Sequence, residues 1–208
     1  MSDGLADLGG LPVYRVADIW LICGPKPPET VTLHSQALQL RAISFTDQSE
    51  LYSLMQRIYP QAYANYWPDG GAWYIDSQFG RANLERELAE ADTAYAFVDL
   101  EDRPVGITRV RYGVACPDQP ELRATKLHRI YLDRDIQGKG VGKWVINQVL
   151  TSCRERRDEC LWLEAMDTAT ASLAFYERAG FTRGGRQTLD IDRLYPHLRG
   201  MVRLYRAV

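Results

Sequence analysis

Apolar residues recur along the chain with two different spacings. Leu51, Leu54, Met55 and Ile58 are three or four residues apart and form one apolar stripe. This spacing predicts a helix that begins near Asp47, since such residues share one helix face. Elsewhere the apolar residues form short runs bounded by turn residues, which is typical of strands.

The strands are predicted at residues 38–43, 94–100, 105–110, 125–132, 161–165, 181–188 and 201–205. Further helices are predicted at residues 81–91, from 140 to about 157, and from Asp167 or Thr168 to Gly180, where a left-handed residue ends the helix. Residues 59–74 are expected to form an aromatic loop, because prolines and glycines interrupt them. Helices that interrupt strands in this order indicate a mixed α/β fold.

A chain of 208 residues with 46% hydrophobic residues suits one globular domain. Residues 1–35 are predicted to be an N-terminal extension, since glycine and proline pairs punctuate them and only residues 13–22 have strand character. The domain itself is expected to span residues 36–208.

The formal net charge is −2, with acidic and basic residues interspersed. The sequence has no basic stripe, so a nucleic-acid partner is not expected. It also has no apolar run long enough to span a membrane. The N-terminus lacks the pattern of a signal peptide. The four cysteines show no Cys-x-x-Cys spacing and indicate free thiols. These features predict a cytoplasmic protein.

The segment Gln137-Gly138-Lys139-Gly140-Val141-Gly142 follows a predicted strand and opens a helix. Glycines allow close backbone approach, and the first N–H groups of a helix attract anions, so this order predicts a phosphate site. A Walker A motif requires Ser or Thr after Gly-Lys, but Trp144 follows Lys143. A Rossmann motif requires a third glycine where Lys143 stands.

A second motif follows the strand Leu161-Trp162-Leu163-Glu164-Ala165. It runs through a short helix to Phe175-Tyr176-Glu177 and Gly180-Phe181. With the Gln-x-x-Gly-x-Gly loop, it resembles the GCN5-related N-acetyltransferases over roughly residues 124–182. The resemblance implies the fold of that family, which is a mixed sheet flanked by helices. In this sheet the fourth and fifth strands splay apart.

The resemblance also implies acetyl-CoA as cosubstrate. Its pyrophosphate would lie on Gln137, Gly138, Lys139, Gly140, Val141 and Gly142, and its pantetheine arm along Ile130, Tyr131 and Leu132. Many relatives carry an asparagine where Ala169 stands, so that contact with pantetheine is lost or replaced.

Acyl transfer to an amine needs a proton acceptor for the amine and a donor for the leaving thiolate. Acetyl-CoA supplies the acyl group, so no metal or protein nucleophile is required. Tyr176 matches the family's proton donor, and Glu164 matches the base of some relatives. His128 is the rival base, because it alternates with Ile130 and Leu132 and should share their face of the strand.

Acceptor binding is predicted for Trp67, Asp69, Trp73 and Asp76, since aromatic faces and carboxylates recognise cationic amines. Alternatively, this aromatic segment packs on the core, or it forms the contact surface of a homodimer. The run Leu127-His128-Arg129-Ile130-Tyr131 resembles the spermidine/spermine acetyltransferases of the PaiA type.

The sequence thus predicts an N-acetyltransferase that moves acetyl to a primary amine, a small cationic amine or polyamine, by direct transfer in a ternary complex. One alternative is a protein N-terminal acetyltransferase, suggested by Leu163-Glu164-Ala165. The other is a non-catalytic acyl-CoA sensor, which Ala169 and the unsettled base allow.

Overall fold

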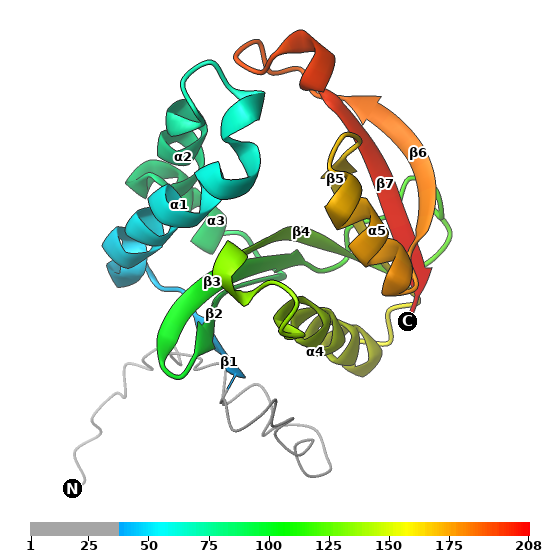
Figure 1. Ribbon diagram of the computed structural model, residues 1–208. Coiled ribbons are helices and arrows are strands. Elements are labelled where there is room, and N and C mark those ends of the chain that lie inside the picture. Colours follow the sequence, from blue (N-terminus) through cyan, green and yellow to red (C-terminus); the bar gives the residue numbers. More distant parts are fainter. Residues whose placement is uncertain (1–37) are drawn as a thin grey trace, which may run out of the picture. The chain divides into compact units, whose positions relative to one another are not determined.

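A computed structural model describes residues 38–208. The predicted extension at residues 1–35, with its strand at 13–22, lies outside the described residues, so the domain boundary stays a prediction. Seven strands form one sheet in the order β1-β2-β3-β4-β5-β7-β6, with β4 and β5 parallel (Figure 1). The predicted mixed α/β class is confirmed.

The first half of the sheet carries helices on both faces. β1 (Leu38–Ala42), β2 (Thr93–Leu100), β3 (Arg103–Arg111) and β4 (Ala124–Leu132) are antiparallel neighbours. The helices α1 (Gln48–Tyr63), α2 (Ala72–Phe79) and α3 (Arg81–Leu88) cover one face, where Phe97 and Ile107 join their core. Val98, the neighbour of Phe97, packs instead against Val145 on the other face, since successive strand residues alternate.

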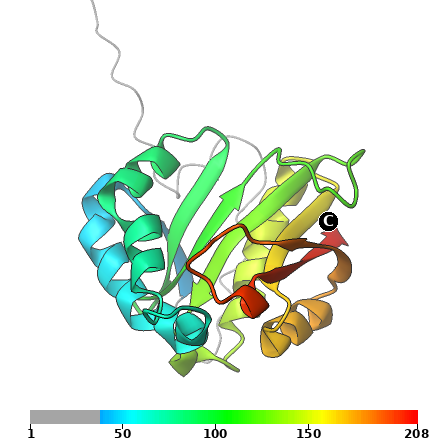
Figure 2. The ribbon, with the colours of Figure 1, turned by 90° about the horizontal axis from the view of Figure 1, so that it is seen from above.

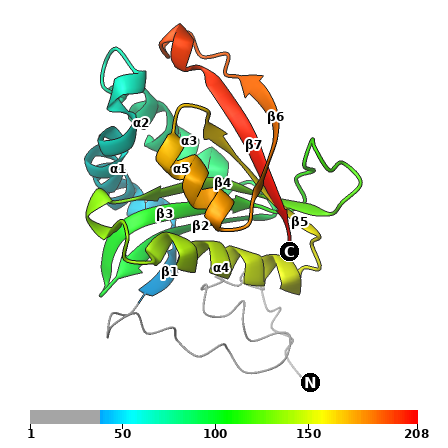
Figure 3. The same cartoon turned by 45° about the vertical axis from the view of Figure 1, so that its right-hand side comes forward.

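The second half of the sheet is built around the helix that follows the glycine loop. α4 (Val141–Glu155) connects β4 to β5 (Cys160–Met166) and lies on the face opposite α1–α3 (Figures 1 and 3). α5 (Thr170–Arg178), β6 (Thr182–Thr188) and β7 (Gly200–Ala207) follow. Leu173 and Tyr176 of α5 share a buried core with Leu163 and Leu204.

The parallel strands β4 and β5 pair only at one end. Their register joins Ala124–Lys126 to Cys160–Trp162, three residues of each strand. Beyond Lys126 the strands diverge, so the β5 side of β4 has backbone groups without a strand partner in the described chain. The predicted splay of the fourth and fifth strands is therefore confirmed.

A β-bulge interrupts β4 next to the splay. Arg109 pairs with Arg129 and Val110 pairs with Leu127, so His128 is the extra residue. A bulge places an additional residue in one strand and breaks the alternation of side chains. The prediction that His128 shares a face with Ile130 and Leu132 was wrong for this reason. Ile130 and Leu132 pack toward α4, whereas His128 turns to Arg109.

Most of the aromatic segment is helical rather than the predicted loop at residues 59–74, and only residues 67–71 form a turn. α1 continues through Pro60 to Tyr63, a short 3-10 turn covers Ala64–Tyr66, and α2 begins at Ala72. Proline disfavours a helix interior, but here Tyr59 and Tyr63 stack at 5.0 Å between ring centroids, and this packing outweighs the local preference.

α5 begins later than predicted. Its N-cap is Ala169 rather than Asp167 or Thr168, and it has no side-chain cap. Its predicted end is confirmed, because Gly180 follows with a φ of 87°. Cys116, Cys153 and Cys160 are free, as predicted, and the structure shows all three to be buried, while Cys23 lies outside the described residues.

The connection between β6 and β7 reaches across toward α1 and α2 (Figure 2). Leu194 in this connection joins the core under those helices, and the Tyr195 N–H donates to the Tyr66 carbonyl at 3.1 Å. This segment, which we call the β6–β7 loop (residues 189–199), was not assigned by the sequence. None of the helices in residues 38–208 has the length and apolar character needed to cross a membrane.

Candidate active site

The glycine loop has the backbone geometry of an anion site. Gly138 and Gly140 have φ values of 76° and 81°, in the left-handed region that favours glycine. Within residues 38–208, the N–H groups of Gly138, Gly140, Val141, Gly142 and Lys143 donate to no protein acceptor. They gather at the N-terminus of α4, where the helix dipole favours a phosphate.

The loop is fixed in place from two sides. Gly142 packs beside the Phe175 ring, which a Cβ at residue 142 would approach to 3.1 Å. On the other side, the Asp133 carboxylate caps the turn Arg134–Ile136 and forms an ion pair with Arg57 of α1. The anion site is therefore held between α5 and α1.

Two adjoining cavities of about 340 Å³ each open beside the splayed strands. The second cavity runs to Gln137 at the start of the glycine loop. It is lined by Leu132, by Arg134 and by residues 168–172. Many relatives have an asparagine where Ala169 stands, and here the lining beside Ala169 includes the hydroxyl residues Thr168, Thr170 and Ser172. Tyr63, Tyr66 and Ser172 line both cavities and form their junction.

Tyr176 reaches the first cavity from α5. The residue is 8% exposed, and its hydroxyl has no hydrogen-bond partner within the described part of the chain. Burial, with a smaller contribution from Tyr63, raises the pKa of the Tyr176 hydroxyl above its ordinary value of about 10. The phenol therefore keeps its proton at neutral pH, which a group that hydrogen-bonds to or protonates a leaving group must do.

Glu164 faces the same cavity from β5. One carboxylate oxygen lies 2.7 Å from the Lys126 ammonium of β4, and both side chains are 15% exposed. Arg203 is its partner across β5 and β7. Glu164 therefore lies at the open end of the β4–β5 pairing and is held there by the neighbouring strand.

His128 also lines the first cavity, but its ring is engaged elsewhere. Nδ1 lies 2.7 Å from the Arg109 guanidinium. Arginine only donates, so Nδ1 is the acceptor and the proton of the neutral ring is on Nε2. Burial lowers the pKa of His128 to about 2, with further lowering from Arg129, Arg109, Lys126 and Arg111. In this geometry neither ring nitrogen offers a free lone pair to an incoming amine.

The buried charges behind the cavity form a network between α3 and the bulge. Glu87 accepts from Arg109 at 3.3 Å and from Arg129 at 2.6 Å. Glu90 accepts from Arg109 at 2.7 Å. The network compensates both arginines and fixes the strand on each side of His128.

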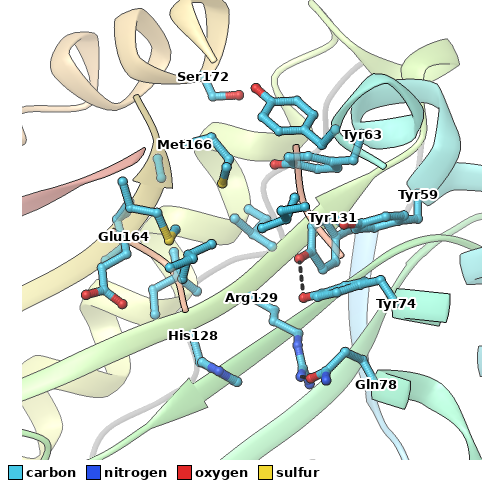
Figure 4. A pocket seen from close by; sticks show the side chains of 18 of the residues that line it. Tyr59, Tyr63, Tyr74, Gln78, His128, Arg129, Tyr131, Glu164, Met166 and Ser172 are labelled. Atoms are coloured by element: carbon cyan, nitrogen blue, oxygen red, sulfur yellow. Dashed lines mark hydrogen bonds between the residues drawn. The ribbon is translucent and has the colours of Figure 1, made fainter. Parts of the chain in front are cut away.

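The first cavity has one aromatic side. Tyr59 stacks on Tyr74 at 4.7 Å between ring centroids, and the Tyr131 ring stands edge-on to Tyr59. The hydroxyls of Tyr74 and Tyr131 lie 3.2 Å apart. Figure 4 shows these rings together on one side of the cavity and Glu164 on the other.

Of the predicted acceptor residues, only Trp67 lines the cavity, where its Nε1 donates to the Tyr59 hydroxyl at 3.0 Å. Asp69 instead accepts from the N–H groups of Gly71 and Trp73 at the start of α2. Asp76 accepts from the Tyr52 hydroxyl. Asp69, Trp73 and Asp76 line neither cavity, so their contacts give the predicted role no support.

Several lining residues were not identified from the sequence. They are Lys126, Arg129, Met166, Ser172, Leu189, Ile191, Leu194 and Met201. Lys126 and Arg129 stand in the predicted fourth strand, but the bulge decides which of its side chains face the cavity. Leu189 and Ile191 alternate with Asp190, a weak strand-like signal that does not reveal where the loop folds.

A parallel strand pair that splays beside a glycine loop, with a tyrosine and a glutamate facing the gap, defines a CoA-dependent acyltransferase. Residues 49–181 match the model of the acetyltransferase (GNAT) family. The match covers more than half of the chain, so the protein belongs to this family and is an acetyl-CoA-dependent N-acetyltransferase.

Solved structures share this fold at low sequence identity. The PaiA N-acetyltransferase from Thermoplasma acidophilum, in complex with coenzyme A, aligns with a TM-score of 0.63 and 15% identity, over 83% of this chain and 99% of that chain. RimL, a ribosomal-protein α-N-acetyltransferase in complex with coenzyme A, gives 0.64 and 14%, over 86% and 98%. The spermidine/spermine N-acetyltransferase SpeG from Vibrio cholerae gives 0.57 and 18%, over 85% and 95%.

Proposed function

We propose that this enzyme transfers acetyl from acetyl-CoA to a small primary amine by direct attack, with Tyr176 as proton donor and Glu164 as proton acceptor. The observation that carries the proposal is that both side chains line one cavity, and that this cavity joins a second one leading to the glycine loop.

The cosubstrate would bind along the second cavity. The unpaired N–H groups of Gly138 and of residues 140–143 suit its pyrophosphate. The partnerless edge of β4, near Ile130 and Leu132, suits the amide groups of the pantetheine arm. The thioester would then reach the junction of the cavities, beside Ser172 and Tyr176.

The reaction balances with these two side chains. The amine nitrogen forms a bond to the acetyl carbonyl carbon, and the amine loses a proton to Glu164, directly or through water. The carbon–sulfur bond breaks, its electron pair leaves on sulfur, and the sulfur takes the Tyr176 proton. No covalent acetyl-enzyme is needed, because the amine and the thioester meet in one cavity.

Glu164 is favoured over His128 as base by their contacts. Glu164 exposes a carboxylate to the cavity and its partner, Lys126, can turn away on a flexible side chain. His128 would have to break its bond to a buried arginine before it could accept a proton.

Two substitutions test the assignment in a thiol-release assay with acetyl-CoA and a panel of amines. Tyr176→Phe and Glu164→Gln should each lower kcat by about 10²–10⁴-fold, the usual contribution of a positioned acid or base. Acetyl-CoA affinity, measured by calorimetry, should stay within about twofold for Tyr176→Phe.

Tyr195→Phe and Glu85→Gln are the matched controls, since both residues are exposed and line neither cavity. They should behave as wild type. Intact-protein mass spectrometry after incubation with acetyl-CoA alone should detect no acetylated enzyme. Acetyl-CoA binding without thiol release for any amine would instead support a sensor.

A further inference from the structure

The charged side chains of the first cavity are all compensated within the protein. Lys126 pairs with Glu164 at 2.7 Å, and Arg129 pairs with Glu87 at 2.6 Å. His128, the remaining ionisable nitrogen base, accepts from Arg109 and is neutral. Among the lining residues in the described chain, Glu164 is the only carboxylate. The cavity therefore holds one anionic group for an amine and none for a second cation.

Apart from Gln78, Ser172 and the tyrosine hydroxyls, the rest of the wall is aromatic or aliphatic. The aromatic residues are Tyr59, Tyr63, Tyr66, Trp67, Tyr74, Tyr131 and Tyr176. The β6–β7 loop adds Leu189, Ile191 and Leu194. Because the aromatic rings and Glu164 occupy opposite sides (Figure 4), an amine at Glu164 would direct the rest of its molecule along this apolar wall.

We infer that the acceptor is a primary monoamine whose remaining body is uncharged and apolar, either aromatic or aliphatic. The inference rests on the proposed function and specifies its substrate class. A cavity of about 340 Å³ lies at the small end of small-molecule sites, which suits such a compact acceptor.

A polyamine fits this wall poorly. Each ammonium group beyond the reacting one would lose its water against rings and alkyl groups. A tyrosine face attracts a cation, but less strongly than a carboxylate that neutralises it. A peptide N-terminus fits poorly for a related reason, since its amides would meet Leu189, Ile191 and Leu194, which offer no side-chain hydrogen bond.

A matched pair of amines isolates the effect of one charge. Hexylamine and 1,6-diaminohexane have the same chain length and differ by a terminal ammonium group. With the full-length enzyme and acetyl-CoA, kcat/KM for hexylamine should exceed that for the diamine at least tenfold, and 2-phenylethylamine should exceed spermidine at least tenfold. An equal or reversed order in either comparison overturns the inference.

A carboxylate placed in the wall should reverse the preference. Ile191→Asp puts a negative charge in the β6–β7 loop beside the cavity and should shift the hexylamine-to-diamine ratio at least tenfold toward the diamine. Gln187→Asp, on the exposed part of β6, adds the same charge outside the cavity and should leave the ratio unchanged. A folded Ile191→Asp enzyme with the wild-type ratio contradicts the inference.

The outcomes separate this inference from the proposed function. Efficient acetylation of spermidine overturns the monoamine inference and leaves the proposed function intact. Acetylation of peptides but not of monoamines overturns the inference and the small-amine acceptor, and leaves only acetyl transfer to an amine. Absence of thiol release with every amine and peptide overturns both. Preference for hexylamine and 2-phenylethylamine supports both.

Discussion

The protonation of His128 can be measured through protein stability, and the result bears on the catalytic base. His128 is surrounded by Arg109 and Arg111 of β3 and by Lys126 and Arg129 of its own strand. Glu87 of α3 and Glu90, which follows α3, pair with the arginines. Burial and these cations hold its pKa at about 2 in the folded protein, against about 6.5 in an unfolded chain.

The sign of the effect follows from proton binding. Between pH 6.5 and 2 the unfolded chain binds a proton at residue 128 and the folded protein does not, so stability is present above pH 6.5 and is lost as the pH falls. From pH 7.5 to 5.5 this one group should lower the free energy of unfolding by about 1.4 kcal/mol.

His128→Asn removes the titrating group but keeps an acceptor oxygen for Arg109, near the place of Nδ1. Urea titrations followed by tryptophan fluorescence at pH 7.5 and 5.5 give the two free energies for each protein. The loss on acidification should be smaller in the variant by about 1.4 kcal/mol, while all other groups cancel in the comparison. His197→Asn, at an exposed histidine, should keep the wild-type difference.

Equal pH dependence in wild type and His128→Asn would refute this reasoning. His128 would then titrate alike in the folded and unfolded states and would be available as a base near neutral pH. A rise of kcat/KM with pH that disappears in His128→Asn and persists in Glu164→Gln would move the catalytic role to His128.

Two further predictions concern the cosubstrate and the acceptor. Gly140→Asp should abolish CoA binding in calorimetry, because it places a negative charge among the unpaired N–H groups. Gly113→Asp, also at a positive φ but in open space on a turn, should bind CoA normally. Equal CoA affinity in the two variants would contradict the anion site. Lys126→Met should lower KM for the amine by up to about fivefold, since Lys126 competes with the amine for Glu164. Lys126→Arg keeps the cation and should leave KM unchanged. An unchanged KM in Lys126→Met would show that no such competition occurs.

The sequence was sufficient for the parts of the protein that depend on local patterns. The backbone is left-handed at Gly138 and Gly140, a conformation that favours glycine. The place of these glycines before an apolar helix predicts the anion site. Gly180 ends α5 for the same local reason. The strands and most helices follow from the spacing of apolar residues, since that spacing decides which side chains are buried together.

The roles of the charged and aromatic residues were decided only by the tertiary structure. The bulge at His128 depends on how β3 pairs with β4, and it turns the histidine away from the face that alternation predicts. Asp69 accepts backbone N–H groups at the start of α2, and Asp76 accepts from Tyr52 of α1, although their residue type alone would assign both carboxylates to a cation. A residue type shows what a side chain can bind, whereas its partners depend on which elements pack against it.

The cavity itself has the same origin. Glu164 and Lys126 are 38 residues apart in sequence and meet because β4 and β5 pair only at one end. The β6–β7 loop reaches the tyrosines of α1 from the far edge of the sheet. The sequence motifs, through their resemblance to a known family, predicted the fold, the candidate cosubstrate loop and the candidate proton donor, because each carries a local pattern. The acceptor wall was decided by long-range packing, which leaves no periodic signal along the chain.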